Sequence, residues 1–147
     1  MENDYLATAD ALENALRLAP RASAVWDMAS DIYHTLSRAN VSYTARAIEC
    51  CQKSLALQGP SNKATAPTWS NLANVLTEVG RHNESIDAAK IAMTLDGSFH
   101  HGYQHAEALL MAKRHEEAQA AYQALLRRAD ARAQPCLLYT SPSPRDS

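Results

Sequence analysis

The stretch from residue 69 to residue 95, WSNLANVLTEVGRHNESIDAAKIAMTL, decides the fold. From Trp69 to Leu76, apolar and small residues recur three and four positions apart, which places them on one face of an α-helix. Gly80 interrupts this pattern, and a second helical pattern follows in which Asn83 is expected to be the N-cap. The stretch therefore predicts two helices, near 66–79 and 83–95, joined by a short turn.

The same pattern recurs along the chain. Trp26-x-x-Ala29-Ser30-x-x-Tyr33 repeats Trp69-x-x-Leu72-Ala73-x-x-Leu76, and the sequence GRHNES from Gly80 recurs 33 residues later as KRHEEA from Lys113. A small or hydroxyl residue followed four positions later by a larger or apolar one recurs as Thr8/Leu12, Ala47/Cys51, Ser85/Ala89 and Ala118/Tyr122. A period of this length is typical of stacked helix pairs. We expect seven helices, near 4–18, 24–37, 43–58, 66–79, 83–95, 100–112 and 115–129.

These residues resemble the signature of tetratricopeptide (TPR) repeats. The resemblance implies an all-α fold, an α-solenoid of antiparallel helix pairs with a TPR-like superhelix. It implies one repeat domain over residues 1–135, with a half unit at 4–20 and full units at about 24–60, 66–98 and 99–130. The large aromatic residues are then interpreted as core. The structural signature consists of Trp26, Ala29, Tyr33, Ala47, Trp69, Leu72, Ala73, Gly80, Ala106, Ala118 and Tyr122.

Two features depart from a regular repeat. Trp26 and Trp69 are 43 residues apart, where a TPR repeat has 34, so we expect two loop insertions, one containing Asn40-Val41-Ser42 and one containing Gly59-Pro60-Ser61-Asn62. In the last unit, Gly102 and His105 stand where the middle unit has Trp69 and Leu72. A shift by one residue would instead place Tyr103 opposite Trp69, and the sequence leaves both registers open.

The composition changes abruptly at Cys136. Residues 136–147, CLLYTSPSPRDS, resemble the conceptual translation of a transposase adapter used in DNA sequencing libraries, over eleven consecutive residues. The alternative is a native Ser/Pro linker. We expect a non-native tail and a gene interrupted near Pro135, so function is argued from residues 1–135. The lone first helix fits either an internal start at Met1 or an N-terminal cap helix.

Charge and hydropathy narrow the function classes. Lys and Arg number 14 against 16 Asp and Glu, a net charge of −2, which provides no basic surface for nucleic acid. No apolar run approaches the roughly 20 residues that span a bilayer. The first residues lack the pattern of a signal peptide. We therefore expect a cytoplasmic protein with no nucleic-acid or membrane partner.

Candidates for chemistry are few. His101 and His105 are four residues apart, next to His100, but no carboxylate or thiol stands at the spacing that would complete a zinc site. Cys50 and Cys51 are adjacent on a predicted helix, where their side chains diverge, and no partner base is indicated. Phosphate-binding and nucleophile motifs are absent from the sequence. We expect no catalytic residue, metal or cofactor.

The TPR resemblance implies a concave groove, lined by the first helix of each pair, where an extended peptide or a partner helix lies. Asn71 lies where relatives that hold peptide backbones carry an asparagine. The set is polar and acidic and lacks the basic residues with which chaperone-type relatives hold acidic peptide ends, so we expect a basic or neutral polar partner. The alternative is a merely solvated helix face. The candidate peptide-binding residues are Asp27, Asp31, His34, Ser70, Asn71, Asn74, Thr77, Glu78, Tyr103, Gln104 and Glu107.

Three functions follow from these expectations. The leading one is a protein-protein interaction scaffold. The second is a substrate-selecting arm of a larger enzyme, for example a transferase, whose catalytic domain would be encoded beyond Pro135. The third is self-association, because a solenoid without polar caps exposes apolar ends.

Overall fold

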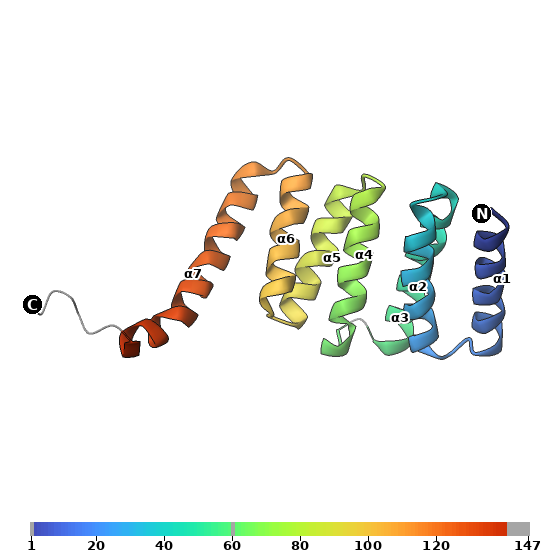
Figure 1. The fold of residues 1–147 in the computed structure, drawn as a ribbon, viewed down its shortest axis with the longest axis horizontal. Helices are drawn as coiled ribbons and strands as arrows, with labels where there is room; N and C mark the ends of the chain where they lie inside the picture. The colour runs from blue at the N-terminus through green and yellow to red at the C-terminus, as the bar shows by residue number, and fades with distance from the viewer. Residues whose placement is uncertain (1, 60, 141–147) are drawn as a thin grey trace, which may run out of the picture.

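The computed structural model describes residues 2–59 and 61–140, and the side chains of residues 4–59 and 61–131. The described residues form seven α-helices and two short 3-10 helices, arranged as a row of antiparallel helices from the N- to the C-terminus (Figure 1). None of these helices is long and apolar enough to cross a membrane. The elements are α1 (Glu2–Leu18), α2 (Ser23–Ser37), η1 (Val41–Tyr43), α3 (Thr44–Gln58), η2 (Lys63–Thr65), α4 (Ala66–Glu78), α5 (His82–Leu95), α6 (Phe99–Met111) and α7 (His115–Thr140).

The predicted α-solenoid is confirmed. The helices pair as α2 with α3, α4 with α5 and α6 with α7, and each pair contacts the next through α3 and α4 or through α5 and α6. The seven predicted helices match α1 to α7 closely, except that α7 continues past the expected end at residue 129. The predicted non-native tail lies outside the described residues from residue 141 onward.

Small residues occupy the points where helices approach most closely. Ala29, Ala47, Ala73, Ala106 and Ala118 are at most 1% exposed. Their short side chains let a neighbouring backbone come close, and larger residues then fill the remaining space. Among the predicted core aromatics, Trp26 and Tyr33 are buried, whereas Trp69 and Tyr122 pack against the core while remaining partly exposed.

The turns between paired helices fix the register of the last unit. Gly80 has a φ of 79° and Lys113 a φ of 61°. After α4, the N–H of Arg81 donates to the carbonyl of Leu76 at 2.9 Å, and after α6 the N–H of Arg114 donates to that of Leu109 at 3.0 Å. The two turns are therefore the same structure 33 residues apart.

This register places Gly102 opposite Trp69 and excludes the shifted alternative. Gly102 is buried against α7, and a Cβ atom added to it would lie only 2.7 Å from Cδ2 of Leu125. Tyr103 is 47% exposed. Where the middle unit has a tryptophan, the last unit thus fills the space with Leu125 from the partner helix.

Both predicted insertions form a turn of the same kind. The Oδ1 atom of Asn40 accepts from the N–H of Ser42 at 3.0 Å, and that of Asn62 accepts from the N–H of Ala64 at 3.0 Å. Each asparagine caps a 3-10 helix that leads directly into the next α-helix. The added residues are thus absorbed before α3 and α4 without shifting their buried faces.

The prediction for Asn83 is wrong. Helix α5 begins at His82, and its N-cap is Arg81, whose side chain makes no capping hydrogen bond. Asn83 lies within the first turn and is exposed. The turn that contains Gly80 is tight enough for the helix to start one residue before the residue with the best capping chemistry.

Replacing Gly102 with tryptophan tests the register. We expect Gly102→Trp to lower the free energy of unfolding by about 3 kcal/mol, because the indole would compete with Leu125 for the same space. Tyr103→Trp is the matched control and should change stability by less than about 0.5 kcal/mol, since residue 103 is exposed. Urea unfolding followed by circular dichroism measures both; a more damaging Tyr103→Trp would support the shifted register.

Candidate peptide-binding groove

Helices α2, α4 and α6 are the first helices of the three full pairs, and α4 contacts both of the others. Between them lies a hollow of about 250 Å³, and Ala73, Ser85 and Ala108 are among the residues that line it. Six of the predicted groove residues also line it: His34, Asn74, Thr77, Glu78, Gln104 and Glu107.

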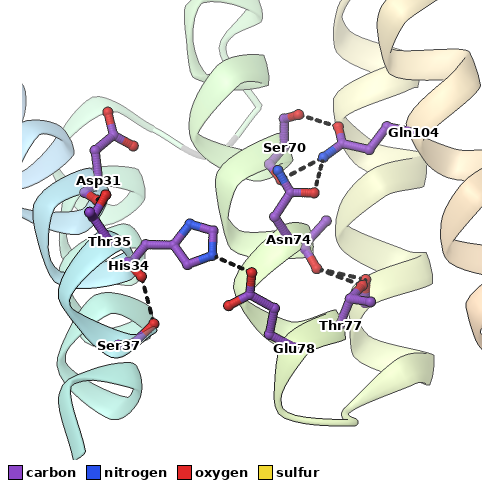
Figure 2. A network of polar contacts seen from close by, with 11 residues as sticks. Asp31, His34, Thr35, Ser37, Ser70, Asn74, Thr77, Glu78 and Gln104 are labelled. Atoms are coloured by element: carbon purple, nitrogen blue, oxygen red, sulfur yellow. Dashed lines mark hydrogen bonds and ion pairs between the residues drawn. The ribbon is translucent and has the colours of Figure 1, made fainter. Parts of the chain in front are cut away.

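An imidazole and a carboxylate connect two of the helices across this hollow. Nε2 of His34 on α2 lies 2.9 Å from Oε1 of Glu78 on α4. Figure 2 shows the two side chains reaching toward each other from their helices. The His34 side chain is 16% exposed and that of Glu78 is 42% exposed. Both remain at the surface of the hollow, where a ligand could contact them.

Gln104 connects α6 to α4. Its Nε2 atom donates to the carbonyl of Ser70 at 2.9 Å and to Oδ1 of Asn74 at 2.7 Å, and its Oε1 atom accepts from the Ser70 hydroxyl (Figure 2). Ser70 and Gln104 are buried, so their polar groups serve the helix contact. Asn74 is exposed and lines the hollow, and its amide group carries N–H donors in addition to the oxygen that accepts from Gln104.

Thr77 belongs to the floor of the hollow. Its hydroxyl lies 3.0 Å from the carbonyl of Ala73 and 2.5 Å from the hydroxyl of Ser85 on α5, and its single proton can serve either contact. Ser85 also donates to the carbonyl of Ala73 at 2.8 Å. These bonds position the floor and occupy the hydrogen-bonding groups of both hydroxyls.

Asp31 and Asn71 form a second link between α2 and α4. Nδ2 of Asn71 donates to Oδ1 of Asp31 at 2.8 Å. Desolvation raises the pKa of the Asp31 carboxyl, and the nearby Asp27 carboxylate raises it further. Asn71 therefore uses a donor within the protein, and this link lies outside the residues that line the hollow.

The structure assigns Asp27 to the packing of the helices, which corrects its expected place in the groove. Its Oδ1 atom accepts from the hydroxyl of Ser54 on α3 at 2.6 Å and from that of Thr68 on α4 at 2.9 Å. Oδ2 accepts from Nε2 of Gln58 at 3.3 Å. One carboxylate thereby joins three helices, because Ser54 and Thr68 are buried and have few other partners to choose from.

The sequence analysis and the lining of the hollow differ at three further residues. Tyr103 is exposed on α6 and packs edge-on against Tyr122, with ring centroids 6.0 Å apart, rather than lining the hollow. Arg38 and Met111 line the hollow and were not predicted. Each continues a predicted stripe by four residues, Arg38 from His34 and Met111 from Glu107, so extending the helical spacing by one turn would have found both.

The two cysteines of α3 are buried, which bears on whether they can react. Cys50 and Cys51 are fully buried, and burial raises the pKa of Cys50 to about 12 and that of Cys51 to about 11. The thiolate is the reactive form of cysteine, so these thiols are inert near neutral pH. Within the described residues, no group of three His, Cys, Asp or Glu side chains is arranged to hold a metal ion.

Solved structures share this fold. A structure of MamA from AMB-1 is 23% identical, with a TM-score of 0.65 over 82% of this chain and 66% of that one. A structure of MamA from MSR-1 is 21% identical, with a TM-score of 0.67 over 88% of this chain and 70% of that one. MamA is a TPR-type helical solenoid, and this chain spans about two thirds of the first of these structures. No family model and no curated protein matches the sequence.

The contacts of Asp27 predict a structural role for this residue. We expect Asp27→Ala to lower the free energy of unfolding by about 2–3 kcal/mol, because the buried hydroxyls of Ser54 and Thr68 lose their acceptor. Asp31→Ala is the control, with an expected loss of about 1 kcal/mol or less, since Asp31 is exposed and loses one bond to Asn71. Thermal and urea unfolding measure both, and equal losses would contradict the assignment.

The buried thiols predict a pH dependence. Burial raises their folded-state pKa values above the ordinary thiol pKa of 9.0, so the two thiols stabilise the fold fully below pH 9 and lose this contribution as the pH rises toward 11 and 12. Each thiol can remove at most about 1.4 kcal/mol per pH unit in this window. The urea midpoint of the protein should fall between pH 8 and pH 10.5, and this fall should be smaller in the double variant Cys50→Ala and Cys51→Ala. Alanine suits both sites because Ala88 and Ala89 occupy the matching positions of α5; an unchanged profile would refute the prediction.

Proposed function

We propose that this chain is a protein-protein interaction scaffold, and that the groove along α2, α4 and α6 binds an extended peptide or a partner helix. The observation that carries the proposal is the hollow between the three helices, which presents exposed polar groups of Asn74, Glu78 and Glu107 on a floor of small side chains. A peptide backbone needs both donors and acceptors along its path, and these side chains supply them.

Polar contacts between the first helices support this use. His34 with Glu78, Asn71 with Asp31 and Gln104 with Ser70 each connect two neighbouring first helices. Groups held from both sides lose little freedom when a ligand binds, which lowers the entropic cost of binding. The groove is therefore pre-organised, and an exposed helix face without such links would not be.

The charge of the groove favours a basic or neutral polar segment. Glu78 and Glu107 line the hollow with two carboxylates, Asp31 of α2 adds a third outside its lining, and Arg38 contributes one fixed positive charge. Arg38 reduces the acidic character that was expected from the sequence without reversing it. A basic peptide would gain favourable electrostatics along α4 and α6, whereas an acidic peptide would meet the carboxylates of Glu78 and Glu107.

Reversing charge in the groove tests the preference. We expect Glu78→Lys with Glu107→Lys to weaken binding of a lysine-rich array peptide on the order of tenfold at low salt and to reduce its salt dependence. Asp10→Lys with Glu116→Lys is the matched control, because these exposed residues on α1 and α7 change the net charge equally outside the groove. Fluorescence anisotropy measures each affinity.

Two results would contradict the proposal. One is equal weakening by the groove and control variants, since the effect would then reflect net charge alone. The other is preferential capture of peptides with acidic C-termini on an array, which would remove the basis for a basic or neutral polar partner.

A further inference from the structure

A second surface lies outside the groove, around Trp69 where α3, α4 and α5 meet. Two adjoining hollows of about 640 and 170 Å³ share Trp69, Asp87 and Ile91 as lining residues. Gln52 and Glu84 line the smaller hollow, and Leu95 lines the larger. We refer to the two together as the Trp69 hollow.

The equivalent place in the preceding unit is closed by the protein itself. Arg46 of α3 lies 5.7 Å from the ring centroid of Trp26, and Lys53 lies 6.0 Å from it. Arg46 is held there by Glu13 of α1, with Nε–Oε2 at 3.0 Å and Nη2–Oε1 at 2.6 Å. Trp26 is also part of the core cluster and is only 8% exposed. A guanidinium anchored by a carboxylate from the preceding helix thus forms a cationic cover over the indole.

The internal repeat shows which residues occupy these positions one unit later. Helix α5 matches α3 at an offset of 38 residues, and buried residues coincide, as in Ile48 with Ile86 and Cys50 with Ala88. Helix α3 matches α1 at an offset of 39, with Leu12 and Leu16 opposite Cys51 and Leu55. At these offsets Glu84 stands in place of Arg46, Ile91 in place of Lys53, and Gln52 in place of Glu13.

The substitution reverses the charge of the site. The cover of Trp26 contributes two cations, whereas the matching positions near Trp69 carry a carboxylate and an apolar side chain. Asp87 adds a second carboxylate, and within the described part of the chain it forms no ion pair. Arg81 donates to both oxygens of Glu84, from Nε to Oε1 at 2.8 Å and from Nη2 to Oε2 at 2.5 Å. Both side chains are about half exposed, so water screens this pair and a ligand arginine can compete with Arg81 for the carboxylate.

We propose that the Trp69 hollow binds an arginine-containing segment of a partner protein. The guanidinium lies in the smaller hollow between Gln52, Glu84 and Asp87, next to the indole, and supplies from the partner the charge that Arg46 supplies at Trp26. Arginine suits the site better than lysine because its planar group stacks on an aromatic ring while donating to carboxylates. A neighbouring apolar side chain of the partner packs against Ile91 and Leu95 in the larger hollow.

Lys90 supports this orientation. Lys90 lines the larger hollow and not the smaller one. Its positive charge repels the guanidinium of the partner from the larger hollow and favours the smaller hollow, where Glu84 lies. The surface is distinct from the groove, because none of the residues that line the groove hollow also lines the Trp69 hollow.

The experiment uses the full chain labelled with 5-fluorotryptophan, which gives one fluorine signal for each of its two tryptophans. The probe is the peptide acetyl-Ala-Arg-Leu-Ala-amide, with peptides that carry Glu or Leu in place of Arg as controls. We expect the arginine peptide to shift the Trp69 signal and leave the Trp26 signal in place, with an affinity on the order of tenfold above either control. Equal affinities, or no binding of the arginine peptide, would overturn the proposal.

Two double variants complete the test. Glu84→Gln with Asp87→Asn removes two exposed charges and should weaken the arginine peptide by about tenfold. Gln52→Glu with Glu84→Arg rebuilds the cover found at Trp26, so it should abolish binding while keeping or raising the melting temperature. Unchanged binding in either variant would refute the site. The groove variant Glu78→Lys with Glu107→Lys should leave this binding unaltered, which separates failure here from failure of the proposed groove.

Discussion

The fold depends on the close approach of helices at positions that hold almost no side chain. Ala29, Ala47, Ala73 and Ala106 are at most 1% exposed, and each lies where a neighbouring helix crosses. In a solenoid every pair contacts only its neighbours, so no distant part of the chain can compensate for a bulky residue at such a point. Gly102 is the extreme case, because even a methyl group there would meet Leu125. The spacing set by these contacts determines where the first helices lie and therefore the shape of both hollows.

Much of the fold could be predicted because helical spacing is local. The apolar stripe and the turn at Gly80 specify α4 and α5, and the recurrence of the same sequence pattern specifies the other helix pairs. The register of the last unit could not, since Gly102 removes the tryptophan marker and Lys113 adopts a positive φ that is uncommon for lysine. The backbone hydrogen bonds of that turn show that the match between GRHNES and KRHEEA, 33 residues apart, is also a match in structure.

For the candidate site, the sequence predicts which helix face a residue occupies but not which residues it contacts. Periodicity and the TPR resemblance indicate which side of a helix a residue occupies, and six of the residues predicted in this way line the hollow. Periodicity cannot identify partners 27–41 residues away, which is why Asp27 was expected in the groove although its carboxylate accepts hydrogen bonds from Ser54 and Thr68. The same limit applies to Ser70 and Gln104, whose groups are used between α4 and α6. Repeats help here, because the contrast between Trp26 and Trp69 becomes visible only when equivalent positions are compared in three dimensions.

The most direct measurement of the central claim is a map of the backbone amide shifts that a captured peptide produces. In ¹⁵N-labelled protein, a peptide selected from an array should perturb amides of α2, α4 and α6, with the largest changes around His34, Asn74 and Glu107, which line the hollow. The signals of amides on the outer faces of α1 and α7 should not shift. Shifts that avoid α2, α4 and α6, or that spread evenly over the chain, would contradict the account of a scaffold that binds its partner in this groove.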